Sequence, residues 1–262
     1  MNKIALLLSF CILVLPLRGG EVDVERVLVP VRTFSPVPGA HGSLWNSSLL
    51  VRSNSSETIM LHGLVRNFGP PSVAVPPMAT LVAEPGGPDY QPGAILRVER
   101  DHAKDLSFSL RVQDISRQAQ TWGTEIPVVR ETELDGRPLV LLGVPMADRF
   151  RTTLRIYDIA SQQEAIVRLR IYGIRPTDIE VSHAIPDELL REINVSLAAP
   201  APGNAESTPG YAEIPDLASL LPAHDYDLLA LEVTRITPGI LPWAFVAVVN
   251  NETQHLTLLT PQ

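Results

Sequence analysis

The alternation of residues over 149–172 (RFRTTLRIYDIASQQEAIVRLRIY) constrains the fold of this chain more than any other feature. Side chains at alternate positions of a strand share a face, so this period of two predicts two strands around a polar break. One face is apolar and the other carries arginines, which predicts an antiparallel pair with one buried and one solvated side. The expected buried residues are Phe150, Thr152, Leu154, Ile156, Val167, Leu169 and Ile171, and the expected solvated residues are Arg151, Thr153, Arg155, Tyr157, Arg168, Arg170 and Tyr172.

The same rhythm occurs earlier, in LWNSSLLVRSNSSETIMLHGLV (44–65). The offset of about 105 residues is close to the length of one β-sandwich domain, which predicts a duplicated fold. VLVPVR (27–32) and EIPVVR (125–130) predict matching upstream strands, each at a sheet edge or a strand start because it contains proline. WAFVAVVNNETQHLTLL (243–259) predicts a closing hairpin whose first strand is covered on both faces.

The 24 prolines and 16 glycines separate short runs rich in Val, Ile, Leu, Thr and aromatic residues, which is typical of an all-β chain. Proline followed by aspartate predicts short helices only at 186–193 and 214–221. We expect a first β-sandwich domain over 21–124 and a second over 125–262. The segment 198–210 is then a long loop of the second domain or, alternatively, a flexible linker.

Residues 1–20 (MNKIALLLSFCILVLPLRGG) have the pattern of a secretory signal peptide, with Lys3 before an apolar run too short to span a bilayer comfortably. A buried N-terminal element and an uncleaved anchor are the alternatives. Cleavage would remove Cys11, the only cysteine, and with it any disulfide or thiolate chemistry. We therefore expect a secreted or cell-envelope protein whose mature chain has no transmembrane segment.

The charge pattern and the motifs predict no reactive site. The net charge is -8 and Lys and Arg do not cluster, so nucleic acid is not an expected partner. The six histidines lack metal-binding spacing. Ser43 in GAHGSLW lacks the context of a nucleophile elbow, and 84–93 lacks the lysine of a phosphate-binding loop. AHDYD (223–227) is interpreted as a solvated turn, so no catalytic, cofactor-binding or metal-binding residue is assigned.

The three tryptophans have different expected environments. Trp45 and Trp243 begin matching strands, which favours packing in or beside the core. Trp122 has no such constraint and is a candidate for stacking on a sugar ring.

Three segments resemble secreted bacterial proteins with tandem immunoglobulin-like β-sandwich domains. They are WGTEIPVVRETELDGRPLVLLGVPMADRFRTTLRIYD (122–158), GSLWNSSLLVRSNSSE (42–57) and WAFVAVVNNET (243–253). The chain departs from that pattern at Thr153 and over 174–222. The resemblance implies the fold and an exported location, and it carries over no functional residue because the family has no assigned activity.

These observations predict a non-catalytic exported interaction or structural module that uses no cofactor and binds protein or cell-surface material. A carbohydrate-binding module and an unrecognised extracellular hydrolase are the alternatives. Paired carboxylates or a Ser–His pair in a deep cleft would favour the hydrolase. A line of exposed aromatic residues that includes Trp122 would favour carbohydrate.

Overall fold

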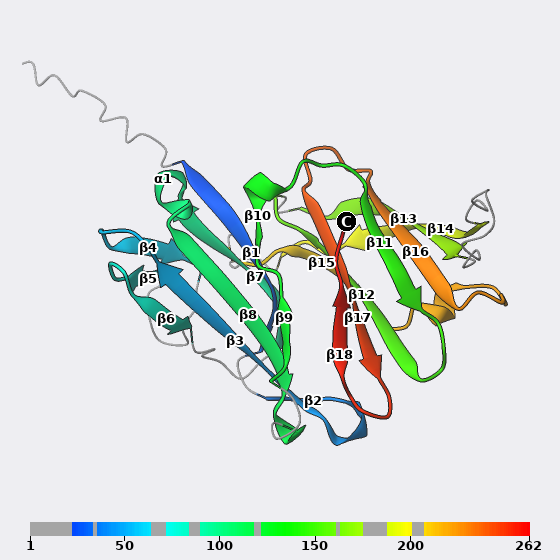
Figure 1. The fold of residues 1–262 in the computed structure, drawn as a ribbon. Helices are drawn as coiled ribbons and strands as arrows, with labels where there is room; N and C mark the ends of the chain where they lie inside the picture. Colours follow the sequence, from blue (N-terminus) through cyan, green and yellow to red (C-terminus); the bar gives the residue numbers. More distant parts are fainter. Residues whose placement is uncertain are drawn as a thin grey trace, which may run out of the picture.

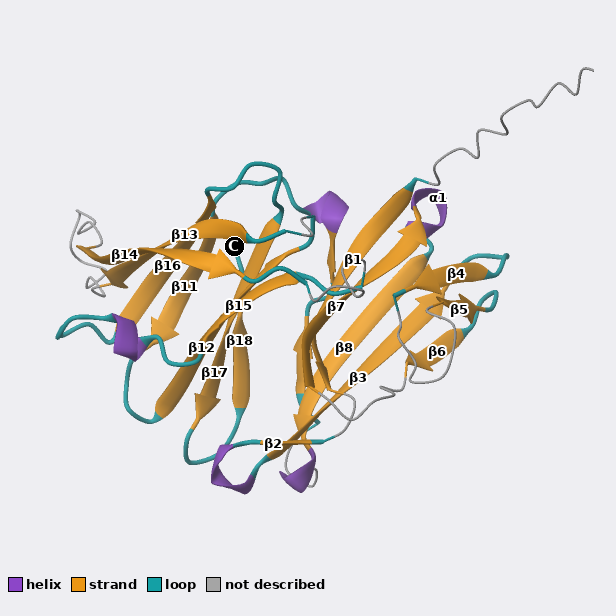
Figure 2. Cartoon of the chain, turned by 180° about the vertical axis from the view of Figure 1, so that it is seen from behind, coloured by secondary structure: helices purple, strands orange, loops and turns teal. Residues whose placement is uncertain are grey.

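A computed structural model describes residues 23–33, 36–63, 72–83, 90–117, 122–160, 163–174, 188–200 and 207–262. Four antiparallel sheets contain nearly all of the regular structure in these residues (Figures 1 and 2). The all-β sandwich class is therefore confirmed. The predicted signal peptide, residues 1–20, lies outside the described residues.

Sheets A and B form the first sandwich. Sheet A has the order β10-β1-β7-β4-β5, and sheet B has the order β2-β3-β8-β9, with β6 also paired to β3. A short helix, α1, precedes β8, and 3₁₀ turns lie at Ala40–Gly42, Ile115–Arg117 and Glu131–Glu133. The element bounds are β1 Val24–Thr33, β2 Val37–Pro38, β3 Leu44–Ser53, β4 Ile59–His62, β5 Ser72–Val75, β6 Thr80–Ala83, β7 Tyr90–Glu99, α1 Arg100–Ala103, β8 Leu106–Asp114, β9 Thr124–Ile126 and β10 Val129–Arg130.

Sheets C and D form the second sandwich. Sheet C has the order β11-β16-β13-β14, and sheet D has the order β15-β12-β17-β18. A 3₁₀ turn lies at Ala218–Leu220. The strand bounds are β11 Leu139–Pro145, β12 Phe150–Asp158, β13 Ala165–Ile174, β14 Glu188–Leu197, β15 Gly210–Ile214, β16 Leu228–Arg235, β17 Pro242–Asn250 and β18 Leu256–Leu259.

The two sandwiches have the same topology. The order β1-β7-β4-β5 recurs as β11-β16-β13-β14, and β6-β3-β8-β9 recurs as β15-β12-β17-β18. The expected match of 27–32 with 125–130 is wrong, because the counterpart of β1 is β11. Segment 125–130 instead lies in the first sandwich, where β9 pairs with β8 and β10 pairs with β1. A short run of strand-forming residues can be aligned with several other runs of the same chain, and only the strand pairing shows which of them is its structural counterpart.

This strand order does not show the immunoglobulin-like arrangement. If the two-residue strand β2 is left out of the count, the second strand of each sandwich pairs with the seventh. These pairs are β3 with β8 in the first sandwich and β12 with β17 in the second. In an immunoglobulin constant domain the second strand lies beside the first and the fifth. The expected boundary between 124 and 125 falls inside β9. It stays a prediction that residues 21–124 and 125–262 are two independently folding domains.

The two strands of the repeated segment do not pair with each other, so the predicted antiparallel pair is wrong. β12 pairs with β15 and β17 in sheet D, whereas β13 pairs with β14 and β16 in sheet C. β3 and β4 are divided in the same way between sheets B and A. Alternation specifies which side chains share a face, but not which strand lies alongside. The polar break therefore crosses the sandwich instead of turning back along one sheet.

Both crossings begin with a buried polar residue that accepts a hydrogen bond from the backbone two residues on. Ser53, the last residue of β3, accepts from the N–H of Ser55 at 3.2 Å. Asp158, the last residue of β12, accepts from the N–H of Ala160 at 3.0 Å and also from that of Leu241 at 3.0 Å. Such side-chain turns satisfy amide groups where a strand ends. The repeat therefore preserves the connection as well as the strands.

The predicted buried face is confirmed. Leu154, Ile156, Val167, Leu169 and Ile171 are fully buried. The predicted solvated face is confirmed for β13, where the two arginines form ion pairs with Glu192.

In β12 the prediction of a solvated face is wrong for Tyr157, whereas Arg151, Thr153 and Arg155 are partly exposed. Tyr157 is fully buried, and the guanidinium of Arg155 lies 5.9 Å from the centre of the Phe245 ring. The physical reason is tertiary, because this face of sheet D packs against the first sandwich.

Sheet D is covered on both faces, and it joins the two sandwiches. On β17, Trp243 and Phe245 belong to the core of the first sandwich, whereas Ala244 and Val246 belong to the core of the second. Tyr157 adds a hydrogen bond from its Oη to the carbonyl of Pro92 at 2.9 Å. The predicted closing hairpin, with its doubly covered first strand, is confirmed. Apolar packing is therefore continuous across the junction.

Both helix predictions are wrong. Residues 188–197 form β14, in which Ile193 and Val195 lie opposite Leu169 and Val167 of β13. Within 214–221 only the 3₁₀ turn Ala218–Leu220 is helical. A start signal of proline and aspartate is local, and pairing with a neighbouring strand overrides it.

Gly143 forms a β-bulge in β11, where the register with β16 shifts between Leu142 and Val144. Its φ is +74°, and an added Cβ would have no neighbour within 4 Å. Gly143→Ala is therefore expected to cost about 1–2 kcal/mol of unfolding free energy through backbone strain alone. Urea denaturation checks this, and Gly143→Asn should lose less because asparagine tolerates this conformation. Equal losses for both substitutions would contradict this explanation.

Asp114 is the last residue of β8, and its carboxyl makes the free energy of unfolding depend on pH. Burial alone raises the pKa of its carboxyl, but hydrogen bonds from the N–H of Leu44 and from the hydroxyl and N–H of Ser116, with the charge of Arg117, leave the pKa below its ordinary value. The stabilisation from this depressed pKa is present above the unfolded pKa, about 4, and is lost as the pH falls through the folded pKa.

Asp114→Asn is expected to cost about 1–3 kcal/mol at neutral pH and to reduce the loss of stability below about pH 4. Urea midpoints measured between pH 2 and pH 7 check this. Glu57→Gln, in an exposed turn, is the control. An unchanged slope on the acid side for Asp114→Asn would rule out the assignment.

Candidate functional site

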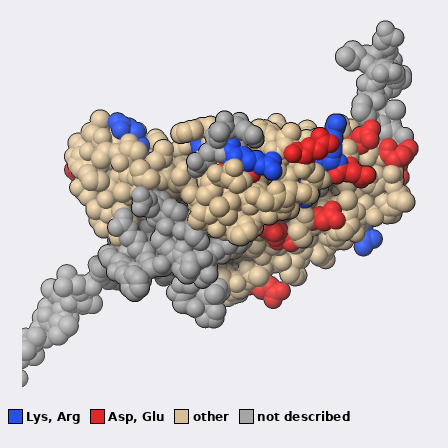
Figure 3. Space-filling model, turned by 90° about the horizontal axis from the view of Figure 1, so that it is seen from below, with Lys and Arg blue, Asp and Glu red and all other residues tan. Residues whose placement is uncertain are grey.

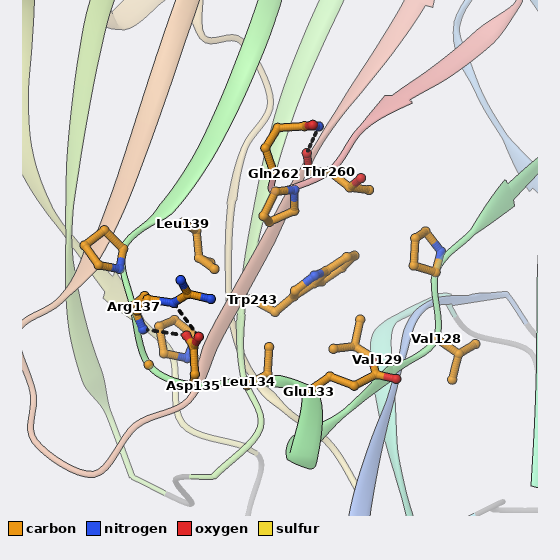
Figure 4. Close-up of a pocket in the computed structure, with 15 residues that line it drawn as sticks. Val128, Val129, Glu133, Leu134, Asp135, Arg137, Leu139, Trp243, Thr260 and Gln262 are labelled. Atoms are coloured by element: carbon orange, nitrogen blue, oxygen red, sulfur yellow. Dashed lines mark hydrogen bonds and ion pairs between the residues drawn. The ribbon is translucent and has the colours of Figure 1, made fainter. Parts of the chain in front are cut away.

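A cleft of about 490 Å³ lies at the junction of the two sandwiches (Figure 4). Its walls are the segment that runs from β9 to β11, the start of β17 and the end of the described chain. The lining residues are Pro127, Val128, Val129, Glu133, Leu134, Asp135, Gly136, Arg137, Pro138, Leu139, Pro242, Trp243, Thr260, Pro261 and Gln262.

The cleft is mainly apolar at its centre. Figure 4 shows Trp243 between Leu134 and Leu139 on one side and Val129 on the other. Trp243 is buried, so little of its ring remains for a ligand. Proline has no N–H, so the four prolines of the lining offer no backbone donors. The centre of the cleft therefore suits an apolar group, while polar and charged residues complete the lining, namely Glu133, Asp135, Arg137, Thr260 and Gln262.

One wall of the cleft is tied to the first sandwich by polar contacts. Glu133 accepts a hydrogen bond from the N–H of Arg130 at 3.2 Å, and the Arg130 guanidinium lies 3.7 Å from the carboxylate of Glu25. Glu131 pairs with Arg100 at 2.9 Å. These contacts give the connection between the sandwiches a defined conformation.

The two carboxylates of the cleft do not form a glycosidase pair. The Arg137 backbone N–H and guanidinium donate to Asp135 and hold the pKa of that carboxyl below its usual range. A general acid needs a raised pKa. Glu133 is occupied by the backbone of Arg130. The lining also contains no serine, histidine, cysteine or lysine.

A second cleft, of about 190 Å³, lies between the sandwiches. Apolar side chains dominate its lining, with Thr33 of β1 and Thr153 and Arg155 of β12 as exceptions. Since it offers no converging polar groups, it is a gap in the packing of the junction rather than a reactive site. The lining residues are Val31, Thr33, Val37, Trp45, Val112, Ile126, Thr153, Arg155, Phe245, Ala247, Val249, Leu256 and Leu258.

One Ser–His contact is present elsewhere. His62 Nδ1 lies 2.6 Å from Ser72 Oγ, and the two residues face each other across β4 and β5. Neither residue lines the two clefts described above. The contact is the cross-strand hydrogen bond that neighbouring polar residues of an antiparallel pair form.

The other residues considered from sequence are placed as follows. Ser43 is buried and its Oγ donates to the carbonyl of Ala40 at 2.8 Å. The interpretation of 223–227 as a solvated turn is wrong for Tyr226, which is buried and donates a hydrogen bond to Glu188. The Tyr226 ring packs so closely on Gly173 that a Cβ there would lie 2.5 Å from it.

The tryptophans divide as expected. Trp243 is buried and Trp45 is half-buried against the first core. Trp122 has 79% of its surface exposed, and the guanidinium of Arg111 lies 5.9 Å from the centre of its ring. It is the one large aromatic side chain exposed in the described ranges, so the line of aromatics that would favour carbohydrate does not occur in them.

In the part of the chain that the structure describes, metal-binding and membrane-spanning features give no further site. The described residues contain no group of three or more His, Cys, Asp or Glu side chains that could hold a metal ion. In the same ranges no helix is long and apolar enough to cross a membrane. On the face shown in Figure 3, the few Lys and Arg side chains are scattered and form no continuous basic patch.

An apolar row crosses the outer face of sheet C, and sequence reasoning missed it. Leu142, Ala230, Tyr172 and Leu189 stand directly opposite one another on β11, β16, β13 and β14. Leu142 and Leu189 are each 49% exposed. The neighbouring row contains Val140, Glu232, Arg170 and Glu192, with Arg170 bonded to both glutamates at 3.2 and 2.7 Å. The signal is cross-strand register, which the sequence does not contain.

Comparison with known proteins finds no matching family, no matching curated protein and no matching solved structure. The fold and the sites therefore define the class directly, as an all-β chain of two sandwiches joined through a doubly covered sheet.

Proposed function

We propose that this chain is a non-catalytic, exported interaction module that binds a protein partner at the cell exterior. The observation that carries the proposal is the apolar row on the outer face of sheet C, beside the ion pairs of Arg170. Exposed apolar groups rimmed by charges are typical of surfaces that bind proteins. The continuous packing of the junction supports this role, because a rigid scaffold presents such a face without a cost in conformational entropy.

Leu142→Glu and Leu189→Glu test this face. Each substitution places a charge in the apolar row without touching the core, so we expect capture of a cell-envelope partner by the purified protein to fall by about tenfold or more. Val82→Glu is the matched control, because Val82 is equally exposed but lies in sheet B. Equal capture by all three variants would reject the face as the binding site.

The non-catalytic part of the proposal has its own test. A hydrolase that used His62 and Ser72 would react with a fluorophosphonate probe at Ser72. We expect no labelling of the folded protein. Labelling that is lost in Ser72→Ala would show that the chain is an enzyme.

The export prediction is also a proposal, supported by Lys3 and the short apolar run that follows it within residues 1–20. N-terminal sequencing of protein from the producing cell is expected to start near Glu21. A sequence that starts at Met1 would contradict it.

A carbohydrate-binding role is the second candidate, and Trp122 is the observation that favours it. An exposed indole gives a flat apolar surface for a sugar ring, and Arg111, which is paired with Glu125, lies beside it as a hydrogen-bonding group. Retention on immobilised cell-wall polysaccharide that is lost in Trp122→Ala would establish this role. If neither the wild-type protein nor Trp122→Ala is retained on the polysaccharide, the carbohydrate-binding role is rejected.

A further inference from the structure

The strand β14 lies at the edge of sheet C and has a partner on one side only within the described part of the chain (Figures 1 and 2). It is ten residues long, whereas its counterpart β5 has four. A long edge strand presents unpaired N–H and C=O groups and is a template for another strand, and natural proteins usually keep such edges short. Directly after β14, Ala198 forms a bridge with Tyr211 of β15, so the open part of this edge ends at Leu197.

The two halves of β14 differ in how well they could accept a strand. The first half contains a bulge, since the register with β13 shifts between Ile171 and Tyr172. Arg191 follows this bulge on the core-facing side, opposite Ile171, and is exposed. Bulges and inward-facing charges protect edges from pairing. The second half, ending at Leu197, has neither, so the segment available for pairing is 192–197.

The side chains of this segment alternate. Ile193 and Val195 lie on the core-facing side, opposite Leu169 and Val167, and both are half-buried against the second core. Glu192, Asn194 and Ser196 are exposed on the outer side. A strand added to the free edge would cover the apolar pair and meet only polar groups on the other face.

The segment is complementary to itself. If two copies run antiparallel about a two-fold axis at Asn194, then Ile193 faces Val195 and Glu192 faces Ser196 of the second copy. An axis at Glu192 or at Arg191 would oppose two like charges, which is destabilising. A closed two-fold pair is also the commonest oligomer of soluble proteins.

We propose that two copies of this chain pair along β14 about a two-fold axis at Asn194, which joins two copies of sheet C into one continuous sheet. The pairing goes beyond the proposed function and does not depend on it. It leaves Leu142 and Leu189 outside the new ladder, so each dimer presents the apolar row twice.

Charge substitutions at Ser196 test the register. Because of the two-fold axis, each substitution meets Glu192 twice. Ser196→Glu is therefore expected to raise the dimer dissociation constant by about tenfold, and Ser196→Lys to lower it several-fold. Sedimentation equilibrium of the purified protein measures both. The same substitutions at Ser107, exposed on β8 in the first sandwich, are the controls and should change nothing.

A cysteine at Asn194 tests the axis itself. Residues directly opposite across an antiparallel pair are close enough for a disulfide, so Asn194→Cys is expected to form a covalent dimer on mild oxidation. Ser107→Cys should stay monomeric on a non-reducing gel. Thermal melts confirm that each variant is folded.

Three results would overturn the proposal. They are a protein that stays monomeric at all concentrations tested, Ser196 variants that shift dimerisation in the same direction, and Asn194→Cys that does not cross-link. The two proposals can fail separately. If Leu142→Glu loses partner capture but still dimerises, or if a Ser196 variant loses dimerisation but still captures the partner, the two surfaces act independently.

Discussion

Phe245→Ala is expected to lower the free energy of unfolding by about 3–5 kcal/mol. Phe245 is fully buried, and its ring packs on those of Tyr157 and Trp243, with centres 6.2 and 5.5 Å away. Truncation loses the transfer free energy of the ring and leaves a cavity beside the 190 Å³ cleft that Phe245 already lines. The loss is a large fraction of the 5–15 kcal/mol that is typical of a folded chain of this kind.

Urea denaturation followed by circular dichroism measures this loss. Because Phe245 belongs to a core that spans the junction, the wild-type protein should unfold in one transition, and the variant should separate the two sandwiches or destabilise both. Trp122→Ala removes another large aromatic side chain, but an exposed one, and should change stability by less than about 0.5 kcal/mol. Equal effects of the two substitutions would show that the junction is not a core.

Gly63→Ala is expected to destabilise the protein by about 3 kcal/mol or more. Gly63 follows β4 with φ at +95°, and an added Cβ would lie 2.2 Å from the carbonyl oxygen of Ile95 in β7. That neighbour is backbone in a central strand of sheet A, so it cannot rotate away as a side chain would. Strain and overlap therefore act together.

Gly143→Ala is the matched control for Gly63→Ala, since it carries the same left-handed strain but has open space around the added Cβ. The difference between the two losses, measured by urea denaturation, gives the cost of the overlap. A loss for Gly63→Ala no larger than that for Gly143→Ala would mean that β4 and β7 move apart easily.

Alternation predicted faces well and partners badly. Leu154 and Leu169 are buried as expected, because the identity of the buried face is written in the residues of each strand. The pairing of β12 with β17 rather than with β13 depends on residues far away in the chain. The same limit explains the mistaken match of 125–130 with 27–32.

The candidate sites were less predictable than the strands. The 490 Å³ cleft is lined from three separate parts of the chain, and the apolar row of sheet C needs the register of four strands. Trp122 was a candidate sugar-stacking residue from sequence only because no strand pattern placed it in a core. Its exposed side chain in the structure makes that role testable by substitution.

The sequence by itself determined that this chain is built of β-strands, which side chains of the repeated segment face a core, and that the strand after Pro242 is covered on both faces. Those properties follow from periodicity, which is local. The tertiary structure alone decided that the polar breaks cross between sheets, that Tyr157 is buried at a junction, and that β14 is left at an edge. Each of these depends on contacts between residues distant in sequence, whose energies no local pattern records.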